Sequence, residues 1–156
     1  MKMNGKTNAM RILDSKKIPY GMHEYDGLMS ATEVAATLGQ DPEKVFKTLV
    51  TVGRSGEHYV FMLPAEGELD LKKAAAFAGE KSIEMVKSKE LLPLTGYIHG
   101  GCSPIGMKKY FRTAIEEAAI LQDTILFSGG RIGLQIETSL ENLQKAVPVE
   151  TADLMK

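Results

Sequence analysis

The sequence has little cysteine: Cys102 is the only one among its 156 residues. A single cysteine excludes a disulfide within the chain and a metal site built from several thiolates. It is typical of the reducing cytoplasm, so we expect a cytoplasmic protein. Long apolar runs are also missing, since stretches such as 73–79 stop far short of the ~20 residues that span a bilayer. We therefore expect no membrane partner.

A surplus of charge of either sign is missing as well. Nineteen basic residues stand against twenty acidic ones and give a net charge of −1. A protein that holds nucleic acid through the phosphate backbone alone usually carries a basic surplus, so any such contact is expected to be local or shared with a partner. The three histidines are not spaced like metal ligands. We expect neither a metal nor a cofactor.

The sequence predicts one compact domain over residues 1–156, because no repeat, low-complexity segment or domain boundary interrupts the succession of predicted helices and strands. The clearest helix is 30–39, where Ser30 and Glu33 have the spacing of a capping box and Gly39 stands at the end. Further helices are expected at 7–18, 41–46, 70–79, 88–94 (stopped by Pro93), 116–121 and 139–147. Strands are expected at 20–25, 47–53, 57–65, 81–86, 109–115, 124–128 and 133–137, with a hairpin turn at 54–56. Helices and strands alternate without a strict βαβ rhythm, which predicts an α+β fold with a curved, barrel-like mixed sheet flanked by helices.

The loop HGGCSPIGMKK, residues 99–109, places the lone thiol after two glycines. A thiolate nucleophile needs a lowered pKa and a nearby base. His99 is three residues away, but the glycines and Pro104 disfavour the alignment that would bring it to the sulfur. We interpret Cys102 as a small buried hydrophobe and keep a cysteine-dependent hydrolase as an alternative. Gly100 and Gly101 let a substrate carbonyl approach their amides, although a tight turn before Pro104 explains them equally well.

Four features together resemble the YbaK/EbsC family of aminoacyl-tRNA deacylases, and the likeness runs from about residue 7 to 147. They are Tyr20 and the segments 44–50, 96–109 and 128–137. Any one of them is weak, but their combination is specific. The resemblance implies a compact α+β enzyme that hydrolyses the ester joining a wrong amino acid to tRNA. It implies mischarged tRNA as the substrate, Cys-tRNA(Pro) first of all, and prolyl-tRNA synthetase as the protein partner.

The resemblance also implies site residues. Lys47 becomes the key catalytic side chain, although a lysine that opens a strand is most often a solvated strand end. The Gly101 amide becomes an oxyanion donor, and the expected substrate-binding residues are Tyr20, Thr48, Gly100, Ser128, Gly129 and Gln135. In the family's mechanism, the thiol of the bound cysteine attacks its own ester. This agrees with a sequence that shows no serine–histidine–acid set.

Two residues depart from the family pattern, which often has a basic residue where Ile132 stands and an acidic one where Gln135 stands. The first change removes a possible phosphate contact, and the second removes a partner for an amine or a water. The nearby Arg131 and Glu137 are not assigned these roles, because a one-residue shift on a strand turns a side chain to the other face. Two alternatives therefore stay open: a deacylase for another mischarged tRNA such as Ala-tRNA(Pro), and a non-catalytic module that binds aminoacyl or nucleotide ends. The sequence leaves the oligomeric state open.

Overall fold

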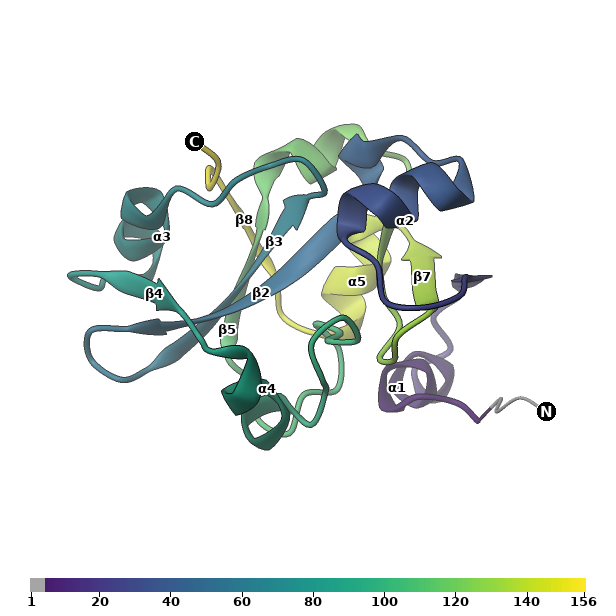
Figure 1. The fold of residues 1–156 in the computed structure, drawn as a ribbon, viewed down its shortest axis with the longest axis horizontal. Coiled ribbons are helices and arrows are strands. Elements are labelled where there is room, and N and C mark those ends of the chain that lie inside the picture. Colours follow the sequence, from purple (N-terminus) through teal and green to yellow (C-terminus); the bar gives the residue numbers. More distant parts are fainter. Residues whose placement is uncertain (1–4) are drawn as a thin grey trace.

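The strands of this protein form two sheets that meet near the middle of the molecule (Figure 1). A computed structural model describes residues 5–156, so residues 1–4 of the predicted 1–156 domain lie outside the described residues. The larger sheet has the order β4-β2-β3-β5-β8 and the smaller one the order β1-β7-β6. In the larger sheet, β2 pairs antiparallel with β3 and β4, whereas β3, β5 and β8 run parallel. The predicted α+β class with a mixed sheet is confirmed.

The larger sheet is built on the predicted hairpin, because two β-rich runs flank Arg54, Ser55 and a Gly56 with a φ of +95°. Its strands are β2 (Phe46–Gly53), β3 (His58–Pro64), β4 (Ile83–Met85), β5 (Arg112–Glu116) and β8 (Glu150–Ala152). The smaller sheet contains β1 (Gly21–Glu24), β6 (Ile125–Ser128) and β7 (Leu134–Thr138). A parallel bridge between Val45 and Leu126 joins the beginning of β2 to β6. The expected single curved sheet is thus divided in two at this bridge.

The helices begin at the capping residues that the sequence offers. Ser30 Oγ accepts a hydrogen bond from the Glu33 amide at 3.2 Å, and the Glu33 carboxylate accepts one from the Ser30 amide at 2.9 Å, so the predicted capping box is present. Thr7 and Asp70 also cap their helices, each by accepting backbone amides of the first turn, without a reciprocal bond. The helices are α1 (Asn8–Ser15), α2 (Ala31–Leu38), α3 (Leu71–Ala78), α4 (Ser88–Thr95) and α5 (Leu140–Ala146).

Several local predictions are wrong. The helix expected at 41–46 is a single 3₁₀ turn, η1 (Pro42–Lys44), because Val45 and Phe46 join the sheet junction. The turn of helix expected at 116–121 is present, as the 3₁₀ helix η2 (Glu117–Leu121). Helix α4 continues through Pro93 and ends at Gly96, whose φ is +85°. Strand β8 was not expected, because its residues show no apolar alternation and only pairing with β5 makes them a strand.

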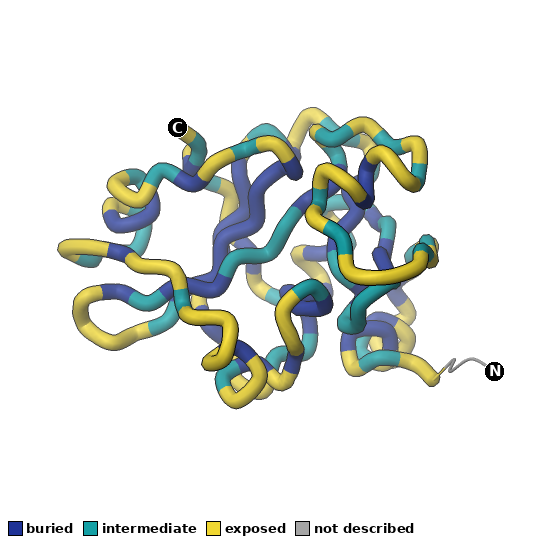
Figure 2. Tube along the Cα trace, viewed as in Figure 1, coloured by how far each residue is buried: buried dark blue, intermediate teal, exposed yellow. Residues whose placement is uncertain are grey.

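Buried residues follow the central strands, and exposed residues follow the loops and helix surfaces (Figure 2). One apolar cluster lies between the smaller sheet and helices α1 and α5. Another lies between the larger sheet and α3. Helix α2 covers the bridge between the sheets, where Val34 and Ala35 pack against Val45 and Leu126. The junction of the two sheets is therefore covered by α2.

Candidate functional site

A cleft of about 300 Å³ lies at the junction of the two sheets. Its walls come from the beginning of β2, helix α2, the loop after α4, and the facing residues of β6 and β7. Five of the residues that the sequence predicted line it together: Lys47, Thr48, Gly100, Ser128 and Gln135. Folding thus brings Lys47, Gly100 and Ser128 into one site, although about fifty residues separate the first two and about thirty the last two.

The cleft lies beside an open edge of β2. The Ala65 amide donates to Val45 O and the Gly53 amide to Glu57 O, both at 2.8 Å, so the odd-numbered residues of β2 hydrogen-bond to β3. The N–H and C=O of Thr48 therefore point to the opposite edge. On that edge β4 pairs with Thr51–Gly53, and the Val86 amide, just after β4, donates to Val50 O at 3.1 Å. Backbone donors and acceptors of β2 are left available next to the cleft.

Lys47 is half-buried, and its ammonium donates to the carbonyl of Ala65 at 3.2 Å. Burial lowers the pKa of Lys47, and the carboxylate of Glu68 opposes this effect. Among residues 5–156 its ammonium has no other partner, so two of its three N–H donors are available to a ligand. The site thus offers a partly desolvated cation.

Two polar atoms that line this cleft are buried without a hydrogen-bond partner within the described chain: Thr48 Oγ1 and Gln135 Oε1. The residue Gln135 is only 6% exposed, and its amide nitrogen donates to the hydroxyl of Tyr25 at 3.3 Å. A buried polar atom without a partner costs about 1–3 kcal/mol. Both atoms can accept a hydrogen bond from a molecule in the cleft, which makes this cleft the candidate binding site.

Ser128, Gln135 and His23 form one row across β6, β7 and β1, because their residues are direct partners in the strand register. Ser128 Oγ accepts the Gly130 amide at 3.3 Å. His23 contacts the carboxylate of Glu137 at 2.7 Å instead of lining the cleft. Glu137 also accepts hydrogen bonds from Lys44 and Thr124, and the Thr124 bond above all holds its pKa at about 2. Contrary to the expectation from the sequence, Glu137 shares the face of Gln135, because the two residues are two positions apart on β7. Its carboxylate is, however, already paired with His23, Lys44 and Thr124.

The glycines near the cleft serve two purposes. Gly100 lines the cleft with a φ of +87°, and no acceptor meets its amide among residues 5–156. The Gly101 amide donates to Ile98 O at 2.9 Å, and a Cβ on Gly101 would lie 2.9 Å from backbone atoms of Arg131 and Ile132. Gly129 is buried, and a Cβ there would lie 2.6 Å from the Leu134 side chain. Gly101 thus allows the two loops to pack closely, Gly129 makes room for Leu134 within the β6–β7 turn, and Gly100 lines the cleft.

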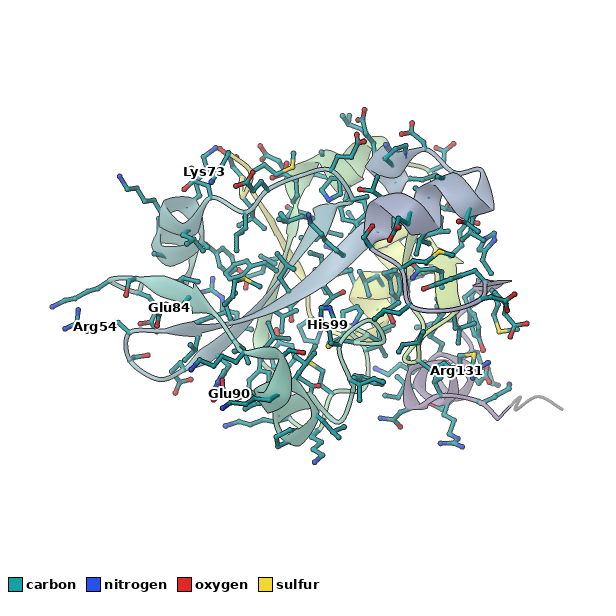
Figure 3. All side chains as sticks on the ribbon, in the orientation of Figure 1. Arg54, Lys73, Glu84, Glu90, His99 and Arg131 are labelled. Carbon is teal, nitrogen blue, oxygen red and sulfur yellow. The ribbon has the colours of Figure 1, made fainter. Side chains whose placement is uncertain are left out.

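Cys102 lines the cleft but is 7% exposed and packs in an apolar cluster with Val50 and Leu91. Burial raises the pKa of its thiol to about 11. His99 also lines the cleft, on the exposed loop after α4 (Figure 3), and no hydrogen bond joins it to Cys102 within the described residues. The thiol is therefore protonated at neutral pH and lacks the base that activates a nucleophile.

Tyr20 is the predicted residue that lies apart. Its hydroxyl donates to Asp14 at 3.1 Å, and it lines a different cleft of about 650 Å³ between α1 and β1. Its role in substrate binding stays a prediction. Sequence reasoning missed Tyr25, Met29 in the loop before α2, and the α2 residues that cover the site, such as Val34. Alternation along β1 would have placed Tyr25 on the face of His23, but nothing local indicated which face the cleft occupies.

No group of three or more histidine, cysteine, aspartate or glutamate side chains within residues 5–156 is arranged to hold a metal ion. In the same part of the chain, none of the helices has the length and apolar character that crossing a bilayer requires. What the cleft offers is a partly buried cation, free amide and hydroxyl groups, and apolar walls. This set suits a small polar ligand that presents both hydrogen-bond donors and acceptors.

Comparison with known proteins agrees with this geometry. The model of the aminoacyl-tRNA editing domain matches residues 26–146. EbsC of Enterococcus faecalis, which carries the name of a Cys-tRNA(Pro)/Cys-tRNA(Cys) deacylase, is 46% identical over 143 residues, or 90% of this chain and 87% of that protein. A proline–tRNA ligase of Pelobacter propionicus is 33% identical over 82 residues, which are 53% of this chain and 14% of the ligase.

A solved structure described as a trans-editing enzyme for prolyl-tRNA synthetase has the same fold. It superposes with a TM-score of 0.84 at 23% identity and covers 98% of this chain and 99% of that one. The family resemblance carried by Tyr20 and the segments 44–50, 96–109 and 128–137 is thereby confirmed. The chain belongs to the aminoacyl-tRNA editing domain family.

Proposed function

We propose that this protein is a trans-editing hydrolase that cleaves the ester of mischarged Cys-tRNA(Pro). Family membership and the similarity to EbsC, with its printed deacylase name, support this function. The observation that carries it is the cleft in which Lys47 lies beside the unpartnered Thr48 Oγ1 and Gln135 Oε1. An aminoacyl ester presents an amine, a carbonyl and a ribose hydroxyl, and these groups match the free donors and acceptors of the cleft.

The substrate itself supplies the nucleophile in this proposal. The cleft holds no activated serine, and its own thiol is protonated because burial raises the pKa of Cys102 to about 11. The thiol of the bound cysteine forms a bond to its ester carbonyl carbon, the bond from that carbon to the ribose oxygen breaks, and the thiol proton passes to this oxygen. Water then opens the cyclic thioester. The protein positions the ester and stabilises the negative charge that develops on the carbonyl oxygen.

Lys47 and Gly100 take these two roles. The Lys47 ammonium binds the ribose or phosphate of the tRNA 3′ end, and a charge-assisted hydrogen bond contributes ~1.5–3 kcal/mol. The free amide of Gly100 donates to the developing oxyanion, since the Gly101 amide is held by Ile98 O. Loss of one oxyanion donor costs about 10²–10³ in rate. Selectivity then follows from chemistry, because alanine and proline have no thiol, whereas shape alone separates them by only ~1–3 kcal/mol.

The deciding experiment compares deacylation of Cys-tRNA(Pro), Ala-tRNA(Pro) and Ser-tRNA by the wild type, Lys47→Ala and Cys102→Ala. We expect Cys-tRNA(Pro) to be cleaved fastest, Lys47→Ala to lose at least about tenfold in rate, and Cys102→Ala to stay active. Equal rates on Ser-tRNA and Cys-tRNA(Pro) would exclude the substrate thiol. A loss of activity in tRNA with a 2′-deoxy terminal adenosine would favour water attack assisted by the ribose hydroxyl.

Prolyl-tRNA synthetase is the proposed partner. The net charge of −1 supports weak binding of tRNA by this chain alone. We expect faster editing at low enzyme concentration when the synthetase is present. Equal rates with and without it would contradict the partnership.

A further inference from the structure

A second and larger cleft, of about 640 Å³, continues from the first one at Lys47. Lys47 and Leu49 line both clefts, and both residues lie on the same face of β2 because their positions differ by two. The other walls of the second cleft come from the loop at 68–70, the beginning of α3, Met85 of β4, and Lys156. The proposed reaction assigns no role to this second cleft.

The cleft carries positive charge in a position to meet a polyanion. Lys47, Lys72 and Lys156 line it together with two carboxylates, Glu68 and Asp70. Glu68 is paired with Lys156 at 2.7 Å, and Asp70 accepts the amides at the beginning of α3 at 2.9 and 3.1 Å. Within residues 5–156 the ammonium of Lys72 has no partner. Lys72, the second residue of α3, is therefore free to contact a ligand in this cleft, whereas both carboxylates are already paired.

The same cleft also exposes apolar side chains. Leu71 is 45% exposed and Met85 is 48% exposed, and they belong to α3 and β4 on two sides of the space. Single-stranded nucleic acid binds where cations follow the phosphates and side chains, most often aromatic ones, pack against the bases. Leu71 and Met85 provide such contacts next to Lys72.

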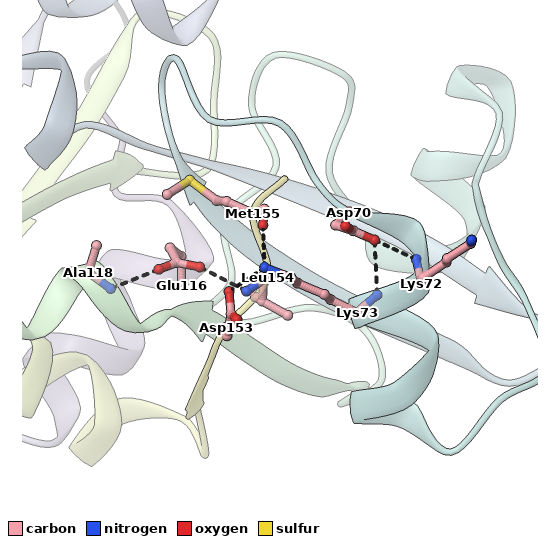
Figure 4. A network of polar contacts seen from close by, with 8 residues as sticks. All are labelled: Asp70, Lys72, Lys73, Glu116, Ala118, Asp153, Leu154 and Met155. Atoms are coloured by element: carbon pink, nitrogen blue, oxygen red, sulfur yellow. Dashed lines mark hydrogen bonds and ion pairs between the residues drawn. The ribbon is translucent and has the colours of Figure 1, made fainter.

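The C-terminal segment is hydrogen-bonded to one wall of this cleft (Figure 4). The Asp70 amide donates to Leu154 O at 2.8 Å, and the Lys73 ammonium donates to Met155 O at 2.8 Å. The carboxylate of Glu116, a buried residue, accepts the amide of Leu154 at 2.8 Å. These bonds tie the loop at 68–70 and the C-terminal segment to each other and to β5 of the larger sheet.

We propose that the second cleft binds the single-stranded nucleotides that precede the terminal adenosine at the 3′ end of the acceptor strand. This inference rests on the proposed function, which places the aminoacyl end in the first cleft. That cleft, at about 300 Å³, lies at the lower limit of small-ligand sites and holds an aminoacylated sugar but not several nucleotides. The strand leaves past Lys47, which then contacts the phosphate between the two clefts. Lys72 contacts the next phosphate.

The test uses three cysteinyl esters of increasing length: adenosine, the trinucleotide CCA and full-length tRNA(Pro). Lys72→Glu is compared with the wild type and with Lys145→Glu, which changes an exposed lysine on α5, away from both clefts. We expect Lys72→Glu to raise KM about tenfold for CCA and for tRNA and to leave the rate on adenosine unchanged. The slope of log KM against log salt should fall by about one. Lys145→Glu should leave all three substrates unchanged.

Other outcomes overturn the inference. An unchanged KM for the CCA ester with Lys72→Glu would show that the nucleotides lie elsewhere. An effect seen only with full-length tRNA would assign Lys72 to the acceptor stem, and an effect seen only when prolyl-tRNA synthetase is added would assign the cleft to a protein partner. Failure of the wild type to cleave any ester contradicts the proposed function itself, and the two failures are thereby distinguished.

Discussion

At the scale of single residues, the site is a place where the protein leaves polar groups unsatisfied. Thr48 Oγ1 is buried without a partner, whereas Thr51 on the same strand donates its hydroxyl to Tyr59 O at 2.9 Å. Thr→Val keeps the shape and removes the hydroxyl. The effect on stability depends on whether that hydroxyl was paired.

We therefore expect Thr48→Val to be neutral or to raise the free energy of unfolding by up to about 1 kcal/mol, while kcat/KM for Cys-tRNA(Pro) falls. The matched Thr51→Val should lower the free energy of unfolding by about 0.5–1.5 kcal/mol, because it removes a buried hydrogen bond from the Thr51 hydroxyl to the Tyr59 carbonyl. Urea denaturation and deacylation assays measure both effects. If Thr48→Val destabilised the protein as much as Thr51→Val, the hydroxyl of Thr48 would have an internal partner.

Cys102 supports a second prediction at this scale. Burial raises the pKa of its thiol to about 11, so at pH 7 only about one molecule in 10⁴ carries the thiolate. We expect Cys102→Ala to keep deacylation within about twofold of the wild type near pH 7, with a small loss of stability from the lost packing. Iodoacetamide should alkylate Cys102 slowly in the folded protein, because the thiol is buried and protonated. A dead but folded Cys102→Ala would make the thiol a protein nucleophile.

At the scale of elements, the site depends on the close contact of two loops, the one after α4 and the turn between β6 and β7. A Cβ on Gly101 would lie 2.9 Å from backbone atoms of Arg131 and Ile132, and backbone cannot move aside as a flexible side chain does. Gly21 on β1 is a suitable control, because a Cβ there would meet its nearest neighbour at 3.9 Å and its φ is not in the left-handed region.

We expect Gly101→Ala to push the loops apart, to lower the free energy of unfolding by about 1–3 kcal/mol, and to reduce deacylation because Gly100 moves with Gly101. Gly21→Ala should leave both quantities nearly unchanged. Thermal denaturation and kinetics on Cys-tRNA(Pro) provide the comparison. Equal behaviour of the two variants would show that the loops are not held by this contact.

At the scale of the whole molecule, Glu137 ties distant segments together. Its carboxylate on β7 accepts hydrogen bonds from His23 on β1, Lys44 of η1 and Thr124 before β6. These bonds hold its pKa at about 2, below the ordinary 4.5. A lowered carboxyl pKa stabilises the fold above the unfolded-state value, and this contribution is lost as the pH falls toward the folded-state value.

We expect Glu137→Gln to lower the free energy of unfolding by about 1–3 kcal/mol at pH 7. This range allows for solvent screening, because the side chains of Glu137, His23 and Lys44 are partly exposed. Between about pH 4.5 and pH 2 the wild type should lose this advantage, so that the two proteins converge. Denaturant titrations at several pH values measure the difference. A difference that stayed constant down to pH 2 would show that the ionised carboxylate does not stabilise the fold.

Local chemistry in the sequence determined much of this fold. The capping box at Ser30 and Glu33, the cap at Asp70 and the hairpin turn at 54–56 act between neighbours in the chain, so their patterns predicted α2, α3 and the β2–β3 hairpin. Where the outcome depended on a distant partner, local patterns failed: β8 is a strand only because β5 lies beside it, and residues 45 and 46 join a sheet junction instead of a helix.

The same distinction holds for the candidate site. The segments around Lys47, Gly100 and Ser128 were found from the sequence, because their residue types and order match those of a family. Only the tertiary structure decided that Tyr20 lies in another cleft, that Tyr25 and α2 complete this one, and that Lys47 lines a second. A side chain's own chemistry is fixed by its sequence, whereas the groups that it faces are fixed by strand register and by the packing of segments far apart in the chain.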